Sequence, residues 1–428
     1  MDNIVFEKDD ISIDTLTDLI GLSCAALVDN NPTLRRVMLL PPDFTRLHSY
    51  AGVITRLYYD TLSSLCEVIH IMPALGTHEP MTLVEVEKFF GEGAITHSVI
   101  AHNWRDDVVS LGHIPGDFVN EVSDGILNEP IDVSVNRRIV NGYYDLVISI
   151  GQVVPHEVVG MANYTKNIVV GCGGASFINA SHMLGASYGM ERIMGRDFSP
   201  VRKVFDYAEQ HFLSQYPIVY ALTVTTNDSS GARLHGLYIG RERKIFEQAV
   251  KRSQQKNISY VSQPLNKVVV FLDPDEFKST WLGNKAIYRT RMAIADGGQL
   301  IILAPGVNKF GEDKGIDALI RRYGYIGREN ILRLARKESD LANNLSAAAH
   351  LIHGSSDGRF EITYAAGGLS RGEIEEVGFA YGDLDELMSR YNPARLTDGF
   401  NEVEGEMVFY ISNPALGLWM VKPDNSIM

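Results

Sequence analysis

The chain has 428 residues, of which 45% are apolar and 21% charged, so it is long enough for two or three domains with large hydrophobic cores. Its formal net charge of −14 argues against nucleic acid or an anionic membrane as a main partner, because phosphate binding needs clustered lysine and arginine side chains. The three cysteines are far apart and have no CxxC spacing, which fits a reducing cytosol and excludes a cysteine zinc cage.

The first ten residues, MDNIVFEKDD, are acidic and lack the apolar core of a signal peptide. No apolar run in the chain approaches the roughly 18 residues that a membrane-spanning helix needs. We therefore expect a cytoplasmic protein that has no membrane partner.

Short apolar runs, each ending at a polar or glycine-rich turn, recur along the chain. Runs of this kind without strict alternation are typical of strands buried on both faces, as in parallel α/β sheets. Buried helix segments can look similar over so few residues, so the flanking signals must decide. The runs are RVMLLPPDFTR (36–46), EVIHIMPALGTHE (67–79), YDLVISIGQVVPHE (144–157), KNIVVGCGGAS (166–176), KVVVFLDPDE (267–276) and QLIILAPGV (299–307).

Helix signals alternate with these predicted strands. Thr82 and Glu85 form a capping box, and Ser199 followed by Pro200 begins a helix. The segment GRERKIFEQAVKRSQQ is a charged amphipathic helix, and WLGNKAIYRTRMAIAD predicts a helix between the last two strands.

This alternation predicts an α/β fold with two domains and mostly parallel sheets. We expect an N-terminal domain over residues 1–258 and a smaller C-terminal domain over residues 265–389. The C-terminal segment 390–428 is expected to pack back on the first domain.

Reactive side chains follow four successive predicted strands of the first domain. Ligands of open α/β sheets bind outside the carboxyl ends of the strands, so these side chains are expected to converge. They are Asp43 and Arg46, then His78, then His156, then Lys166 with Gly171, Gly173 and Gly174.

Each of these residues also has an ordinary structural interpretation. Arg46 can clamp a carboxylate or phosphate, or it can form a loop salt bridge with Asp43. His78 lies just before a helix start, which suits a neutral base, although most loop histidines have no special role.

The segment after the third predicted strand leaves similar alternatives open. The glycines can present N–H groups to a phosphate, but GCGGAS matches neither a dinucleotide-binding nor a Walker motif. Lys166 can be a buried nucleophilic amine or a surface lysine. His182 can bind a metal or cap a helix.

The stretches DFTR, ALGTHEPMT and QVVPHEVVGMANYTKNIVVGCGGASFINASHM, in this order, resemble the nickel-dependent lactate racemase family, whose members use a nickel-pincer nucleotide cofactor. The spacing of His156, Lys166 and His182 matches the family's histidine–lysine–histidine array. The resemblance covers nearly the whole chain and implies two α/β domains with an active site in the cleft between them.

The resemblance also implies a role for each matching residue. Lys166 is expected to be joined covalently to the cofactor, and His182 to be the protein ligand of nickel beside one carbon and two sulfurs of the pincer. His78 and His156 are expected to be paired acid and base groups. Further catalytic contacts are expected from Arg46 and Lys285, and further cofactor contacts from Asp43, Thr45, Arg46, Gly173, Gly174 and Trp281.

A member of this family is expected to be a racemase or epimerase that inverts C2 of a 2-hydroxy acid by reversible hydride transfer to the cofactor. Its expected partners are a small hydroxy acid and the proteins that mature the cofactor. Two departures bear on the substrate: Trp281 and Leu282 stand where Tyr-Gln is expected, and Glu79 stands where arginine is more usual. They favour a substrate larger or more polar than lactate, such as the aldonate gluconate.

Three other functions are compatible with the same residues. The protein can be a lactate racemase proper. It can be a zinc-dependent hydrolase that uses His78, His156 and His182. It can also be a non-catalytic carrier of the nickel nucleotide, which would need Lys166 and His182 alone.

Overall fold

The computed structural model describes residues 2–228, 231–415 and 417–422, which form two compact units. The first unit comprises residues 1–184 and 193–257, and the second comprises residues 185–192 and 258–428. Helix α7 (Ala175–Tyr188) begins in the first unit and ends in the second. No helix among the described residues is both long and apolar enough to span a bilayer.

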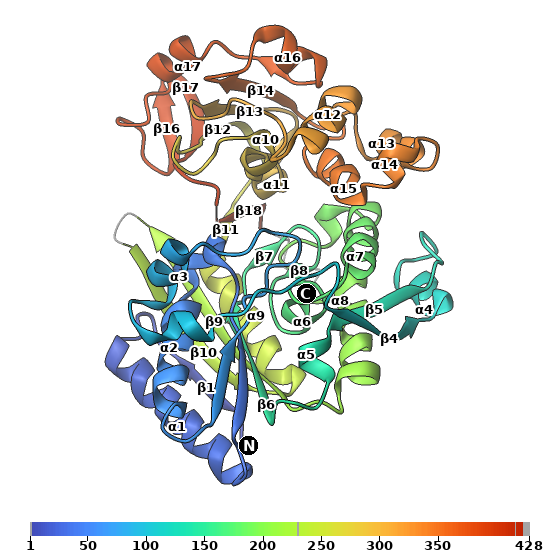
Figure 1. The fold of residues 1–428 in the computed structure, drawn as a ribbon. Helices are drawn as coiled ribbons and strands as arrows, with labels where there is room; N and C mark the ends of the chain where they lie inside the picture. The colour runs from blue at the N-terminus through green and yellow to red at the C-terminus, as the bar shows by residue number, and fades with distance from the viewer. Residues whose placement is uncertain (1, 229–230, 416, 423–428) are drawn as a thin grey trace. The chain divides into compact units, whose positions relative to one another are not determined.

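A six-stranded sheet forms the centre of the first unit (Figure 1). Strands β9, β6, β2 and β3 run parallel to one another, and β10 is antiparallel to both of its neighbours, β9 and β1. The order across the sheet is β1 (Ile4–Glu7), β10 (Gly231–Gly240), β9 (Ile218–Asp228), β6 (Leu146–Gln152), β2 (Arg36–Leu40) and β3 (Val68–Ile71).

Both faces of this sheet are buried. On β2, Val37 and Leu39 pack in one hydrophobic core, and Met38 and Leu40 in the other, because successive side chains of a strand point to opposite faces. This two-sided burial explains why the strands are continuous apolar runs and confirms the predicted α/β class.

Helices cover the two faces. The first core is shared with α1 (Ile13–Asn30), α2 (Ala51–Leu62) and α3 (Leu83–Phe90). The second core is shared with α8 (Pro200–Ala208) and α9 (Arg243–Asn257). The capping box at Thr82 and the start of α8 after Ser199 are both as predicted. Shorter elements of this unit are η1 (Phe44–Ser49), η2 (Ala94–Ser98), β4 (Val108–Ile114), α4 (Gly116–Val122), β5 (Ile131–Asn136), α5 (Arg137–Val140), β7 (Pro155–His156), β8 (Gly160–Met161), α6 (Thr165–Val169) and η4 (Glu209–Leu213).

The second unit contains another six-stranded sheet, in which β12 and β13 form the predicted parallel βαβ unit. Its order is β15 (Ala380–Tyr381), β14 (Glu361–Ala366), β13 (Ile294–Ala304), β12 (Leu265–Phe271), β17 (Glu406–Ile411) and β16 (Gly399–Val403). Its helices are α10 (Thr280–Gly283), α11 (Lys285–Thr290), α12 (Lys314–Tyr323), α13 (Arg328–Ala335), α14 (Ser339–Ala342), α15 (Leu345–His353), α16 (Arg371–Glu376) and α17 (Leu384–Arg390).

The structure corrects three details of the sequence analysis. Residues 281–296 do not form one helix, because the chain breaks at Asn284 and β13 already begins at Ile294. Residues 399–411, expected to return to the first domain, supply β16 and β17 to the second sheet, where β17 is parallel to β12. After them, β18 (Leu418–Val421) pairs with β11 (Ile258–Val261) within the second unit.

The third correction concerns residues 166–176, which were predicted as a strand. They begin inside helix α6, and the apolar residues Ile168 and Val169 are buried on it. A buried helical turn and a buried strand give the same short apolar run, so periodicity alone does not separate them.

Candidate functional site

Three neighbouring parallel strands carry the predicted site residues to one edge of the first sheet. Asp43 follows β2, His78 follows β3, and His156 follows β6. Because β6 and β3 flank β2, their carboxyl ends meet at the same edge. The loops are joined there by bridges between Pro42 and Ala74 and by a hydrogen bond from Gly76 N to the Gly171 carbonyl.

Asp43 and His78 form a hydrogen-bonded pair. Nδ1 of His78 lies 2.6 Å from Oδ2 of Asp43, while Oδ1 of Asp43 accepts from the backbone N–H and the hydroxyl of Thr45. Asp43 is almost fully buried; burial alone would raise its pKa, but the bond with His78 and the positive charge of Arg46 hold the pKa below its usual value. Asp43 is therefore a carboxylate, Nδ1 of His78 carries a hydrogen, and Nε2 points away from the pair.

His156 has the opposite ring arrangement. Its Nδ1 accepts a hydrogen bond from the backbone N–H of Val158 over 3.1 Å. Burial lowers the pKa of His156 well below its usual value, and the positive charges of Lys166 and Arg46 lower it further. The ring is therefore neutral and carries its hydrogen on Nε2.

Helix α6 is tied to the same edge of the sheet through the residue next to Lys166. The side-chain amide of Asn167 donates to the carbonyl of Leu40 over 2.9 Å and to the hydroxyl of Ser149 over 3.0 Å. These partners belong to β2 and β6, so the buried amide fixes α6, and with it Lys166, against two neighbouring strands.

The environment of Lys166 weakens the hold of its amine on a proton. Burial and the positive charges of Arg46 and Arg202 together lower its pKa to about 8, against the opposing effects of Glu157 and Asp43. A lysine with such a pKa is a far better nucleophile near neutral pH than a surface lysine. The structure thus favours the nucleophilic interpretation of this residue over the surface one.

His182 lies on α7 in the geometry of a histidine that binds a metal. Its Nδ1 donates to the carbonyl of Ile178, one turn earlier, over 2.6 Å. Burial lowers the pKa of the ring, although the bond to Ile178 opposes the shift. The neutral ring therefore presents an Nε2 lone pair, the arrangement that metal-ligating histidines adopt when a carbonyl holds the other nitrogen.

Glu157 is a residue of this site that the sequence analysis did not single out. Its charge acts on His156, Lys166 and His182, raising the pKa of each against the effect of burial. Its Oε2 lies 3.7 Å from Nδ1 of His156. The one signal in the sequence was its position directly after His156. In a continuous strand Glu157 would point to the opposite face from His156, but β7 ends at His156, so this rule does not apply to Glu157.

Arg46 and Thr45 lie on the 3₁₀ turn that follows β2. Asp43 caps this turn, and Arg46 interrupts it with non-helical backbone angles. The guanidinium group of Arg46 is close enough to lower the pKa of both Lys166 and His156. The cation therefore belongs to the same cluster as the lysine and the histidines.

The glycines play a different role from the predicted one. The N–H of Gly173 donates to the carbonyl of Val170, and that of Gly174 donates to the carbonyl of Ser134, so neither group is available for a phosphate. A Cβ atom on Gly173 would lie 1.8 Å from the carbonyl oxygen of Val169. These positions are glycine because backbone segments approach closely there.

Two predicted residues, Trp281 and Lys285, belong to the second unit. The ring of Trp281 stacks on His350, with centroids 4.3 Å apart, and the amine of Lys285 lies 5.6 Å from the centre of the Phe277 ring. Nε2 of His350 is in turn 2.9 Å from the hydroxyl of Tyr325.

Within the described ranges, no three His, Cys, Asp or Glu side chains gather as a metal site. The zinc site proposed for His78, His156 and His182 therefore has no support in the geometry. His182 fits a metal for which this chain supplies one ligand and a bound group supplies the others.

The fold and these side chains define an α/β protein whose first unit combines a low-pKa lysine, an Asp–His pair and two buried neutral histidines at one sheet edge. Residues 16–192 match the family model of the lactate racemase N-terminal domain. This part of the chain is therefore similar to that family's N-terminal domain, which confirms the resemblance found in the sequence. No curated protein matches the chain in sequence.

Two solved structures share the fold along almost the whole chain. A crystal structure of a Thermotoga maritima protein, from the Northeast Structural Genomics Consortium, has 22% identity and a TM-score of 0.82, and covers 97% of this chain and 100% of its own. The lactate racemase apoprotein of Thermoanaerobacterium thermosaccharolyticum has 15% identity and a TM-score of 0.72, and covers 97% and 94%.

Proposed function

We propose that this protein is a racemase or epimerase that inverts C2 of a 2-hydroxy acid, with a nickel-pincer nucleotide joined to Lys166. The lactate racemase N-terminal domain over residues 16–192 supports the reaction class. The observation that carries the proposal is the presence of Lys166 and His182 in one cluster: the charge of Lys166 acts on His182, Lys166 is a low-pKa amine, and the neutral ring of His182 has its Nδ1 held by the Ile178 carbonyl.

These two residues fit the cofactor by their donor chemistry. Nε2 of His182 would be the protein's nitrogen ligand to nickel, a metal that accepts nitrogen beside sulfur donors. The neutral amine of Lys166 would form the covalent link. When bound, the cofactor would supply the acceptor and donor for the hydrogen at C2.

The other side chains would handle the substrate's charge and its hydroxyl proton. Arg46 would bind the carboxylate, since its guanidinium can form two parallel hydrogen bonds to it. His78 would accept the hydroxyl proton at Nε2, because Asp43 holds the hydrogen on Nδ1. His156 offers an Nε2–H to the same oxygen from the end of another strand.

The substrate we favour is larger or more polar than lactate, such as an aldonate. Leu282 has no amide to donate to a small substrate, and the neighbouring Trp281 stacks on His350. Cofactor-loaded protein should be tested on a panel of hydroxy acids of increasing length. Turnover of lactate equal to that of every longer acid would contradict this choice.

Denaturing mass spectrometry of protein produced with cofactor-maturation proteins tests the central claim. The peptide containing Lys166 should carry the added mass of the cofactor, and Lys166→Ala should carry none. Lys203→Ala, at an exposed lysine of α8, is the matched control and should keep the adduct. An adduct on another lysine would refute the proposal.

A further inference from the structure

Arg202, on helix α8, is a fully buried cation with an unusual set of partners. It has no exposed surface, and its Nη2 donates to the carbonyls of Met161 over 2.7 Å and Asn163 over 3.2 Å. Nε and Nη1 have no hydrogen-bond partner in the described part of the chain. Burying a guanidinium group costs free energy unless the group gains something in return. The two hydrogen bonds of Arg202 to one short segment are therefore the place to look for its role.

That segment contains two consecutive strained residues directly before helix α6. Asn163 has a φ of 66°, and Tyr164 has a φ of 58° with a ψ of −134°, although neither is a glycine. Residues other than glycine adopt such angles only where the surroundings hold them there. Lys166 follows two residues after Tyr164, so the backbone angles of the turn set the direction in which the Lys166 side chain points.

Tyr164 is held through its own side chain. Its ring stacks on Phe246 with centroids 5.2 Å apart, and its hydroxyl donates to the carbonyl of Arg241 over 2.9 Å. The turn is therefore held by two sets of contacts. Arg202 binds the carbonyls of Met161 and Asn163, and the packing against Phe246 of α9 holds the side chain of Tyr164.

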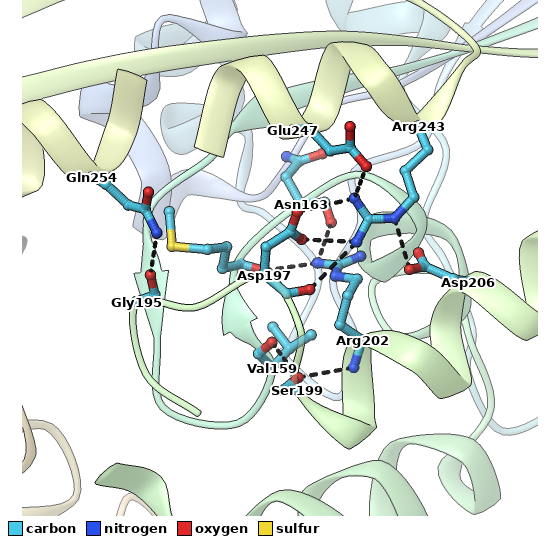
Figure 2. Close-up of polar contacts among 11 residues, drawn as sticks. Val159, Asn163, Gly195, Asp197, Ser199, Arg202, Asp206, Arg243, Glu247 and Gln254 are labelled. Carbon is cyan, nitrogen blue, oxygen red and sulfur yellow. Dashed lines mark hydrogen bonds and ion pairs between the residues drawn. The ribbon is translucent and has the colours of Figure 1, made fainter. Parts of the chain in front are cut away.

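A second arginine, Arg243, forms ion pairs with the acidic side chains of this region. It pairs with Asp197 over 2.9 Å and with Asp206 over 2.8 Å, and it also bonds to Glu247 (Figure 2). Figure 2 shows the guanidinium group of Arg202 directed toward Asn163 beside this network. The two arginines thus have different partners, because Arg243 pairs with carboxylates and Arg202 donates to the turn.

We propose that Arg202 is a positioning residue that holds the strained Asn163–Tyr164 turn by its carbonyl groups and so fixes the orientation of Lys166. The value of this orientation to the enzyme rests on the function proposed above, in which Lys166 carries the cofactor. The positioning itself is a property of the chain alone and can be measured without the cofactor.

The test is selective methylation of Lys166 by formaldehyde and cyanoborohydride in the full-length protein without cofactor, with exposed Lys203 as the internal reference. Arg202→Lys keeps a cation, but its side chain is shorter than the path to Nη2, so its amine cannot hold both carbonyls at the same distances. We expect it to lower the ratio of Lys166 to Lys203 methylation at least five-fold. Arg243→Gln, which disturbs the same cluster without touching the turn, should stay within two-fold of the wild type.

A second-site change separates positioning from general stability. Asn163→Gly relieves the strain at φ 66° and should restore the ratio in the Arg202→Lys protein to within two-fold of the wild type. A wild-type ratio in Arg202→Lys, an equal fall in Arg243→Gln, or no restoration by Asn163→Gly would each overturn the proposal.

If Arg202→Lys does not fold, a pair of variants at Asn163 decides the question. Asn163→Ala and Asn163→Gly remove the same side-chain amide, but only alanine is strained at positive φ. Asn163→Ala should lower the methylation ratio and Asn163→Gly should not; equal ratios would overturn the proposal. The absence of a cofactor adduct on Lys166 would refute the proposed function instead, and these ratios would be unaffected.

Discussion

Asp43 and His78 come from neighbouring strand ends and share a hydrogen bond of 2.6 Å, in which the carboxylate holds the hydrogen on Nδ1. His156 has the reverse arrangement, since the backbone N–H of Val158 occupies its Nδ1. The two histidines expected to be paired acid and base groups therefore differ in how their rings are held: Asp43 holds Nδ1 of His78, and His156 presents an Nε2–H.

Asp43→Asn should lower kcat by about 100-fold while KM changes little, because an amide no longer fixes the hydrogen on Nδ1 of His78 and loses the negative charge. Steady-state kinetics on cofactor-loaded protein measure both parameters. The control is Asp132→Asn, whose carboxylate lies 3.6 Å from exposed His113 outside the site, and which should keep its activity. A kcat within three-fold of the wild type would show that the Asp43–His78 pair has no part in turnover.

His182→Ala should reduce bound nickel at least about ten-fold, because the ring supplies the metal's only proposed protein ligand. Elemental analysis of purified protein measures the metal, and circular dichroism checks that the fold is intact. His113→Ala, at an exposed histidine, should retain nickel. Unchanged nickel content in His182→Ala would remove this residue from the metal site.

Gly173→Ala should destabilise the protein by about 1–3 kcal/mol, because the new methyl group would overlap the carbonyl of Val169. Gly21→Ala is the matched control: a Cβ there has no neighbour within 4 Å, and alanine favours helix α1 by about 0.5–1 kcal/mol. Chemical denaturation measures both changes. Equal effects at the two positions would contradict the close approach at Gly173.

The strands and their polar ends could be predicted from the sequence because burial on both faces leaves a continuous apolar run. The runs at 36–46, 67–79 and 144–157 all contain strands, and the residues that follow them meet at one edge. The run at 166–176 was wrong because a single buried helical turn has the same composition.

The interactions that set each side chain's state could not be predicted, because they join residues far apart in sequence. Asn167 bonds to Leu40, 127 residues away, and Arg202 reaches Asn163 across 39 residues. The hydrogen bond from the N–H of Gly174 to the carbonyl of Ser134 also joins residues far apart in sequence. Spacing identified which residues could react but not which backbone groups were already bonded.

The reactivity of Lys166 should depend on pH with a midpoint of about 8. The pKa is depressed from the usual lysine value of about 10.4, so the amine is neutral above pH 8, and its methylation rate should rise about ten-fold per unit below that pH and then level off. Arg46→Gln removes the largest charge that opposes protonation and should move the midpoint upward. An unmoved midpoint would mean that Arg46 is not close to the amine in solution.

The final prediction concerns the hydrogen at C2. The C2–H of a 2-hydroxy acid is too weak an acid for a histidine to remove efficiently as a proton, whereas its hydroxyl proton can pass to His78 as the hydrogen leaves C2. If the hydrogen leaves C2 as a hydride and returns to the other face, it does not exchange with water. Racemisation in D₂O should therefore give product with the original hydrogen at C2, and substrate deuterated at C2 should keep its deuterium in H₂O. Mass spectrometry or proton NMR of the product measures this directly. His78→Ala should slow both net directions, as a reversible cycle requires, without changing the isotope content at C2. Extensive exchange of C2 with solvent would instead establish proton abstraction as the mechanism.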